Sequence, residues 1–523
     1  MPTESLAPVT YINPPSDLEP HHAMLDRELP GFRAGLGRSW GNFIAGRQDQ
    51  DGTAYISRSP INTEIVLGTF IEPSTAAITR AVAAARGASE IWGKMPWQER
   101  LKRLAEVREM LNGRKYELAM AVMHETGKTR VEALAETEEA VALLDYYCDQ
   151  MQRHEGFVEP SNSAMPGETS QTFLRPFGTF GIICPFNYPV ALPVGMIAPA
   201  LAAGNTVVAK WSPAAGLTGS MLAEIFSADP LPAGTFNSLC GTSSGPRLVE
   251  EPGVDGIAFT GSHSTGMAIL RKIASGPFMR PVLAEMGGKN PTYVAQSADP
   301  LIAAEGIAKS AFNFQGQKCT ATSVAFVHES HYDTFVTEVL RRVEALKFGD
   351  SIDRSVTNGP LINEVAVRRF EEAAAHAAEV GTLLCGGTRI QGELSAGHFV
   401  RPAVVTNLPE DDLLFKTELF APLLIVAPFI SLSEAIDRGN SVNMGLAAGF
   451  FGNDEAELVE FLNRAQAGVL YANRRNGATN GAWPGIQSFA GWKGSGLTGK
   501  GALGPHYLPQ FMREQSRTIS GFN

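Results

Sequence analysis

The sequence predicts an α/β protein with two or more domains, each built around a parallel, doubly wound sheet. The chain has 523 residues, which is more than one hydrophobic core usually serves. Short apolar runs of strand length alternate with helical segments in two separate stretches, and strands that alternate with helices form parallel sheets. Apolar residues make up 44% and charged residues 19% of the chain, so its composition is that of a globular protein.

Residues 1–60 are rich in proline and glycine, and we expect them to be irregular. A long helical region follows over residues 74–151, where Leu104 and Val107 share the spacing of one helix face. The run 125–128 contains a glycine and divides this region into two predicted helices.

The two α/β stretches follow this helical region. The first is predicted to hold strands at 180–184, 206–210, 236–240 and 256–260 and a helix at 216–227. The second is predicted to hold strands at 323–327, 423–427 and 468–471 and helices at 303–314 and 332–345. The C-terminal stretch 511–519 is predicted to be extended and to lie outside both cores.

The bulk properties argue against several classes of partner. With 43 basic and 54 acidic residues the net charge is −11, which argues against nonspecific nucleic-acid binding. No apolar run reaches membrane-spanning length and residues 1–20 lack signal-peptide features, so no membrane association is expected. Five widely spaced cysteines without C-x-x-C, and histidines without H-E-x-x-H, disfavour disulfides and a metal site. We therefore expect a cytoplasmic protein without a bound metal.

Cys319 and Glu285 carry the clearest chemistry. The Cys319 thiol lies among polar neighbours, namely Gln317, Lys318 and Thr320, whereas the other four cysteines lie in apolar or mixed runs. Glu285 stands earlier in the chain, close to two glycines. A thiol supplies a nucleophile and a carboxylate supplies a general base, so the pair indicates covalent catalysis through a thioester or a related adduct.

Phosphate binding is indicated at one glycine turn and not at two others. Two G-x-G-x-x-G matches, over 494–499 and 499–504, follow no convincing strand and leave no chain for a ribose-binding strand, so we interpret both as turns. The turn at Gly261 and Ser262 follows a predicted strand and opens a helical segment, whose positive end attracts phosphate. Lys210, at the end of another strand, could meet a ribose hydroxyl or a phosphate, and a surface lysine is an equally good interpretation.

The loop 185–189 offers a donor for a developing oxyanion. Two prolines stiffen the loop, and Asn187 between them carries an amide N–H₂ group. Donors aimed at a developing alkoxide can lower a barrier by ~3 kcal/mol. Taken alone, an asparagine turn between prolines is the simpler interpretation.

These segments stand in one order along the chain, and Glu418 with Phe420, just before Pro422, completes the series. The order and spacing resemble the NAD(P)-dependent aldehyde dehydrogenase superfamily over nearly the whole chain. The segments around Glu285 and Cys319 are the most specific part of this resemblance. Within the superfamily the sequence is most similar to the 1-pyrroline-5-carboxylate (glutamate γ-semialdehyde) dehydrogenases.

The resemblance implies an enzyme that oxidises a small-molecule aldehyde to a carboxylic acid and reduces NAD or NADP. Cys319 would attack the aldehyde, while Asn187 and the Cys319 backbone N–H would hold the oxyanion. Hydride transfer would leave a thioester, and Glu285 would activate the water that hydrolyses it. The residues implied to contact the dinucleotide are Pro185, Phe186, Lys210, Ser212, Gly261, Ser262, Met286, Gly287, Glu418 and Phe420.

Two related activities are disfavoured by the residues present. Relatives that transfer the acyl group to coenzyme A do without a glutamate at position 285, so Glu285 favours release of the free acid. A relative that keeps the fold but has lost catalysis is a further hypothesis, because fold alone does not prove activity. The presence of Cys319, Glu285 and Asn187 together argues against it.

The resemblance also implies how the chain is divided. It implies a Rossmann-type dinucleotide-binding domain over 1–156 and 177–290, a second α/β catalytic domain over 291–500, and a small β oligomerisation element over 157–176 and 501–523. An exposed sheet edge in the last element often pairs with another subunit, so we expect a homo-oligomer.

The cofactor segment departs from the common family pattern at Pro213. Relatives often have Lys-Pro-Ser-Glu where this chain has Lys210 to Pro213, and that glutamate holds the adenine ribose hydroxyls in NAD-preferring members. With Pro213 a 2′-phosphate meets less repulsion, so NADP becomes possible beside NAD.

Substrate recognition is assigned to the stretch 480–487. It resembles the anchor at which relatives hold an α-carboxylate on backbone N–H groups, and Gly481 and Ala482 match that pair. Relatives usually carry serine after the nucleophile, where this chain has Thr320, and Trp483 is bulky beside the anchor. The expected substrate is L-glutamate γ-semialdehyde, as in proline catabolism, with a different semialdehyde or an aromatic aldehyde as the alternative.

Overall fold

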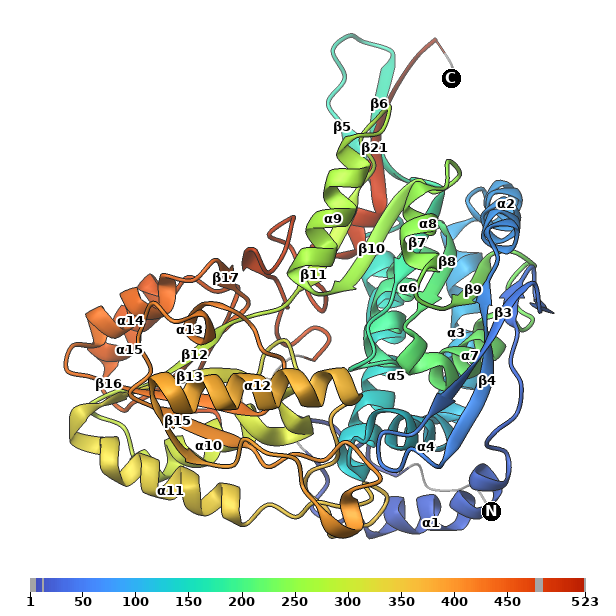
Figure 1. Cartoon of the computed structure of the whole chain (residues 1–523). Helices are drawn as coiled ribbons and strands as arrows, with labels where there is room; N and C mark the ends of the chain where they lie inside the picture. Colours follow the sequence, from blue (N-terminus) through green and yellow to red (C-terminus); the bar gives the residue numbers. More distant parts are fainter. Residues whose placement is uncertain (1–5, 12–13, 476–482, 522–523) are drawn as a thin grey trace.

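The computed structural model describes residues 6–11, 14–475 and 483–521. Two lobes, each built around a seven-stranded sheet, lie side by side, and an arm of three strands projects from one of them (Figure 1). The predicted architecture of two α/β sheets is confirmed. Across the described parts of the chain, none of the helices combines the length and the apolar character needed to cross a bilayer.

The first sheet is parallel from β7 to β11 and has two antiparallel strands at one edge. Its order is β11-β10-β7-β8-β9-β1-β2. The strands are β1 Asn42–Ile44, β2 Arg47–Asp49, β7 Thr179–Ile183, β8 Thr206–Trp211, β9 Phe236–Cys240, β10 Gly256–Gly261 and β11 Val282–Met286. Successive side chains of a strand point to opposite faces, so Ile182 and Ile183 enter different cores.

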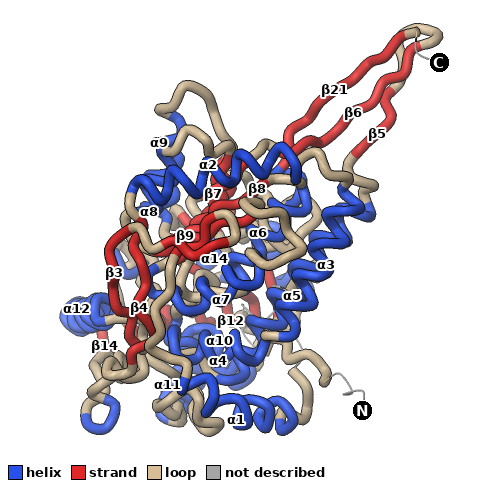
Figure 2. Tube along the Cα trace, turned by 90° about the vertical axis from the view of Figure 1, so that its right-hand side faces the viewer, coloured by secondary structure: helices blue, strands red, loops and turns tan. Residues whose placement is uncertain are grey.

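Helices cover both faces of this sheet, which explains why β7, β8 and β9 are buried along their whole length. Helices α5, α6 and α7 share a core with one face, and α2, α8 and α9 share a core with the other (Figure 2). Their bounds are α2 Thr75–Trp92, α5 Arg130–Arg153, α6 Ala191–Ala203, α7 Gly216–Phe226, α8 Ser244–Glu250 and α9 His263–Ala274.

The second sheet has the order β14-β15-β16-β13-β12-β18-β19, and only β14 is antiparallel to its neighbour. Its strands are β12 Asn290–Val294, β13 Thr322–His328, β14 Thr382–Cys385, β15 Ala403–Thr406, β16 Leu423–Phe429, β18 Ala447–Phe451 and β19 Val469–Ala472. The helices α12 Glu364–Val380, α14 Leu432–Asn440 and α15 Glu455–Arg464 cover one face, and α10 Pro300–Phe312 and α11 Tyr332–Glu344 cover the other.

Two predictions for the N-terminal part are wrong. Residues 1–60 are not irregular throughout, because α1 covers Glu19–Ala34 and buries only His21 and Leu25, which leaves little apolar periodicity to detect. The next region holds four helices instead of two, namely α2, α3 Trp97–Gly113, α4 Lys115–Thr126 and α5. The predicted break is present, with Gly127 at φ 76° ending α4, and a second break without a strong signal separates α3 from α4.

The projecting arm joins the C-terminal strand to an earlier hairpin. Its strands are β5 Val158–Ser161, β6 Glu168–Pro176 and β21 Met512–Ser520, and β21 is antiparallel to β6 along its whole length. The predicted extension is confirmed from Met512 onward, but Phe511 and Met512 are buried in the core of the first lobe, so the stretch 511–519 does not lie wholly outside both cores. Nearly all of β21 is exposed, and the arm stands clear of both lobes in the two ribbon views (Figures 1 and 2).

Candidate active site

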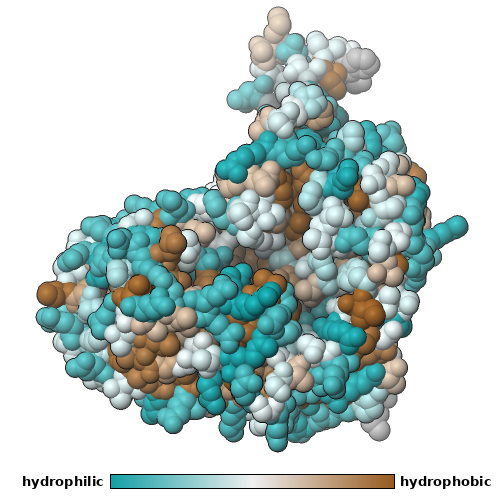
Figure 3. All heavy atoms as spheres, in the orientation of Figure 1, coloured by the Kyte–Doolittle hydropathy of each residue, from teal (hydrophilic) through white to brown (hydrophobic). Residues whose placement is uncertain are grey.

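A cavity of about 470 Å³ is lined by residues of both lobes, and the surface is hollowed where the lobes meet (Figure 3). It lies at the carboxyl ends of β7, β8, β10 and β11, where open α/β sheets bind ligands. All the predicted site residues that the structure describes line it: Pro185, Phe186, Asn187, Lys210, Ser212, Gly261, Ser262, Glu285, Met286, Gly287, Cys319, Thr320, Glu418 and Phe420. Gly481 and Ala482, the predicted substrate anchors, lie outside the described residues.

Cys319 follows a loop with an uncommon backbone conformation. The three successive residues 314–316 are left-handed, with φ of 51°, 52° and 63°. Gly316 fits there because a Cβ atom would lie only 2.8 Å from a backbone carbonyl oxygen. Gln315 is buried and donates its amide to the Gly359 carbonyl over 2.9 Å, so tertiary contacts hold the strained turn that presents the thiol.

The Cys319 thiol is held in its neutral form. Burial raises the pKa of the thiol above its ordinary value, and the carboxyl groups of Glu418 and Glu285 raise it further. The backbone N–H groups of Cys319 and Thr320 act in the opposite direction. Since the thiolate is the reactive form of cysteine, attack on a carbonyl requires a base that accepts the thiol proton.

Asn187 links the loop 185–189 to the loop that precedes Cys319. It lies between β7 and α6, is buried, and donates its Nδ2 hydrogen to the Gln317 carbonyl over 3.1 Å. A carboxamide carries two N–H hydrogens, so a second remains for an oxyanion formed at Cys319. Asn187 lies in a bend between the two prolines, as the simpler interpretation has it, and its buried side chain also lines the cavity.

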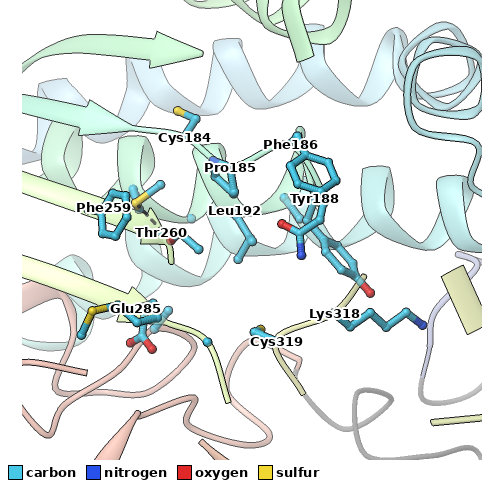
Figure 4. Close-up of a pocket in the computed structure, with 18 of the residues that line it drawn as sticks. Cys184, Pro185, Phe186, Tyr188, Leu192, Phe259, Thr260, Glu285, Lys318 and Cys319 are labelled. Carbon is cyan, nitrogen blue, oxygen red and sulfur yellow. Dashed lines mark hydrogen bonds between the residues drawn. The ribbon is translucent and has the colours of Figure 1, made fainter. Parts of the chain in front are cut away.

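Glu285 presents a carboxyl group from the end of β11 (Figure 4). Its Oε2 atom is buried without a hydrogen-bond partner among the described residues, and the Ala502 backbone N–H donates to the carboxyl group. Burial raises the pKa of Glu285 well above its ordinary value. A carboxylate with a raised pKa is a stronger base, and the Oε2 atom, which has no hydrogen-bond partner among the described residues, can accept a proton from water.

The dinucleotide side of the cavity is built from strand ends and a helix start. Ser262 caps α9, accepting the Thr265 backbone N–H over 3.3 Å, so the positive end of that helix faces the cavity. Lys210 is only 8% exposed at the end of β8, which excludes the surface-lysine interpretation. Burial lowers the pKa of Lys210.

Glu418 reaches across from the second lobe to the segment after Glu285. A Cβ atom at Gly287 would collide with the Glu418 carboxylate, and the Gly288 backbone N–H donates to that carboxylate over 3.1 Å. A side chain at position 287 would therefore push the Glu418 carboxylate away from the Gly288 N–H. Burial raises the pKa of Glu418 to about 7, against the opposing effects of the Gly288 N–H and the charges of Lys289 and Arg369.

Other polar side chains that line the cavity were not singled out from the sequence, namely Tyr11, Glu139, Tyr188, Lys318 and Arg369. Glu139 belongs to α5, where burial and the charge of Glu136 raise its pKa to about 8 while Lys128 opposes the shift. In the sequence it is one of several glutamates in a helix, a pattern typical of a solvated face. Only the packing of α5 against the loop 185–189 shows that Glu139 is buried.

The cavity combines a cysteine, a carboxyl group and an amide donor, and comparison with known proteins shows which family carries it. Residues 47–516 match the Aldehyde dehydrogenase family, and the chain belongs to that family.

Its relatives include enzymes for two semialdehydes. A 1-pyrroline-5-carboxylate dehydrogenase from a Geobacillus strain is 31% identical over 509 residues, covering 96% of this chain and 97% of that protein. An α-ketoglutaric semialdehyde dehydrogenase from Bacillus subtilis is 33% identical over 440 residues, covering 83% and 89% of the two chains. The structure of a 1-pyrroline-5-carboxylate dehydrogenase from Thermus with bound NAD covers 100% of both chains, with a TM-score of 0.92 and 30% identity.

Proposed function

We propose that this protein oxidises L-glutamate γ-semialdehyde to glutamate with NAD or NADP as hydride acceptor. The observation that carries the proposal is the convergence of Cys319, Asn187 and Glu285 in one cavity with the predicted dinucleotide contacts. Relatives that span nearly the whole chain are 1-pyrroline-5-carboxylate dehydrogenases, which supports this substrate.

The first half of the reaction forms a thioester at Cys319. The Cys319 sulfur attacks the aldehyde carbon, its proton passes to a base, and the carbonyl oxygen becomes an oxyanion. Asn187 and the Cys319 backbone N–H donate to that oxygen. A dinucleotide held in the cavity would supply the acceptor for the hydride that leaves the same carbon, and a thioester would remain on the sulfur.

The second half releases the acid. Glu285 takes a proton from a water molecule, the resulting hydroxide attacks the thioester carbon, and the carbon–sulfur bond breaks. The thiol is regenerated and the product leaves as a carboxylate. The Glu285 carboxyl group suits this role, because its Oε2 atom has no partner among the described residues and can hold the water and accept its proton.

The residues on the opposite side fit a dinucleotide. The start of α9 at Ser262 can hold phosphate, buried Lys210 can meet a ribose hydroxyl or a phosphate, and Glu418 can accept from ribose hydroxyls. The aromatic rings of Phe186 and Phe420 meet edge to face 5.9 Å apart and bound the same region. The NAD in the Thermus structure supports this assignment.

A different semialdehyde is the second candidate, supported by the α-ketoglutaric semialdehyde relative. The two substrates differ in chemistry, because glutamate semialdehyde carries an ammonium group beside its carboxylate. A carboxyl group can pair with an ammonium group, and Glu139 provides one in the cavity wall. An aromatic aldehyde is a third candidate substrate, because the bulky Trp483 stands beside the predicted carboxylate anchor in the sequence.

The test is NAD(P)H formation with glutamate semialdehyde, succinic semialdehyde, a short aliphatic aldehyde and benzaldehyde. We expect the highest kcat/KM for glutamate semialdehyde. Glu139→Gln should lower kcat/KM for that substrate by about tenfold, the cost of a charge-assisted pair, while leaving succinic semialdehyde unaffected. Preference for another aldehyde in the wild type would reject the substrate and keep the chemistry.

We further propose a cytoplasmic homo-oligomer. All five cysteines are free, which suits a reducing compartment. The exposed edge strand β21 suits pairing between subunits, and it belongs to the segment assigned above to oligomerisation.

A further inference from the structure

Two buried lysine–glutamate pairs lie behind the reacting groups, and the chemistry above does not use them. Lys128 pairs with Glu136 at 2.6 Å, and Lys318 pairs with Glu132 at 3.5 Å. Both carboxylates belong to α5 and stand one helical turn apart, so they share a face. The first pair is completely buried, and buried charges persist only when they are paired and hydrogen-bonded.

The Lys128 ammonium contacts both loops that carry the reacting groups. Its Nζ atom lies 3.2 Å from the centre of the Tyr188 ring and 4.8 Å from that of the Phe314 ring. Tyr188 directly follows Asn187, and Phe314 begins the left-handed turn before Cys319. A desolvated cation is attracted to aromatic faces, so Lys128 joins the two loops.

Glu136 holds the C-terminal end of the loop 185–189, where α6 begins. One carboxylate oxygen binds Lys128, and the other accepts the backbone N–H of Val190 over 2.7 Å and of Ala191 over 3.3 Å. These N–H groups stand at the start of α6, where the first helical N–H groups have no partner within the helix. The chain that follows Asn187 is therefore held by Lys128 at Tyr188 and by Glu136 of α5 at Val190 and Ala191.

We propose that Glu136, acting through Lys128, is a positioning residue that sets the distance from the Asn187 amide to the Cys319 reaction centre. The inference rests on the proposed function. Glu136 does not line the cavity and does not touch the aldehyde. The Asn187 amide already bonds the Gln317 carbonyl across the two loops, so a shift of either loop moves the donor away from the oxyanion.

The test is the kinetics of Glu136→Gln. Glutamine keeps an acceptor for the Val190 N–H and nearly the same shape, but it leaves the Lys128 ammonium without a countercharge. We expect kcat to fall roughly ten- to a hundredfold, the cost of a misplaced catalytic group, with unchanged aldehyde KM and NAD affinity. The kinetic isotope effect of an aldehyde deuterated at its carbonyl carbon should rise, because hydride transfer becomes the slow step.

Glu138→Gln is the matched control. Glu138 belongs to the same helix and pairs with Lys115 at 2.7 Å, and neither side chain lines the cavity. We expect this variant to keep the wild-type kcat and isotope effect. A purely structural role for Glu136 would lower the amount of folded enzyme without changing the isotope effect.

The outcomes separate the two proposals. If the wild type oxidises no aldehyde, the proposed function fails. If the wild type is active and Glu136→Gln matches Glu138→Gln in kcat and isotope effect, the positioning role is rejected alone. If Glu136→Gln does not fold, the double variant Lys128→Met with Glu136→Gln replaces it, because removing both buried charges is tolerated more readily than removing one. The double variant should show the same loss of kcat. A wild-type kcat in the double variant would reject the inference.

Discussion

At the scale of single residues, burial determines the chemistry of the site. Cys319, Glu285, Glu418 and Glu139 all have raised pKa values, and burial is the largest cause for each. Each group therefore holds its proton to a higher pH than it would in water. The sequence predicts Cys319 and Glu285 as reacting groups and Glu418 as a cofactor contact. It does not show how deeply each side chain is buried.

Glu285→Gln should separate the two halves of the reaction. Without a base for water, the thioester accumulates, so a burst of NAD(P)H should precede a steady rate reduced by about a hundredfold or more. Rapid-mixing absorbance with saturating aldehyde measures both phases. Cys319→Ala is the control and should show neither. Loss of the burst together with the steady rate would mean that Glu285 also serves the thiol.

Pro213→Glu should shift the cofactor preference. Pro213 is the first residue of a short turn after Ser212, so a glutamate is compatible with the backbone there. Its carboxylate would repel a 2′-phosphate, so kcat/KM for NADP should fall by about tenfold or more while that for NAD is kept or rises. Equal use of NADP by both proteins would contradict the ribose argument.

At the scale of elements, the prediction works best where the pattern is purely local. Strands β8 and β9 were found from the sequence. Both are fully buried, and β8 carries an apolar run over residues 207–209, whereas β9 mixes apolar and polar residues. The helix α1 was missed because its buried face is small, and its position depends on ion pairs with distant residues, including Asp26 with Arg130 and Arg354. Such contacts join parts of the chain that no local window contains.

Glu125 should make the junction of α4 and α7 sensitive to pH. Its carboxyl accepts the backbone N–H of Leu217 over 2.7 Å and of Thr218 over 3.0 Å, at the start of α7. Burial raises its pKa from 4.5 to about 7, so the folded state binds the proton more tightly than the unfolded state. The contribution of Glu125 to the free energy of unfolding is therefore fully present below pH 4.5 and is lost as the pH rises to about 7.

Glu125→Gln removes this titration. The variant should gain stability relative to the wild type across the same pH window, by up to about 3 kcal/mol. Thermal unfolding at a series of pH values measures the difference. Glu117→Gln, on a more exposed part of α4, is the control and should show no such trend. A constant difference at all pH values would show that Glu125 does not titrate there.

At the scale of the whole molecule, the cavity exists only because two separately predicted sheets meet. Glu285 ends a strand of the first sheet, whereas Glu418 precedes a strand of the second and lies against Gly287. The arm belongs to neither sheet and presents β21 as an exposed edge. The proposed catalytic cavity and the proposed assembly surface therefore lie in different parts of the fold.

A chain that ends at Met512 should lose the proposed assembly. Met512 and Phe511 are buried in the first lobe and are kept, whereas the exposed remainder of β21 is removed. Sedimentation should then show a smaller species than the full-length protein, with unchanged NAD binding as the control for folding. An unchanged oligomer would place the subunit contact elsewhere.

The sequence by itself determined the reactive groups, their order along the chain and the two α/β units, because side-chain type and apolar spacing are local properties. It left Lys210 and Asn187 with two interpretations each, and the structure buries both side chains beside the cavity. Tertiary structure alone revealed Glu139 and the Lys128–Glu136 pair. The physical reason is that burial, pKa and loop position depend on which distant segments pack together, and local pattern does not contain that information.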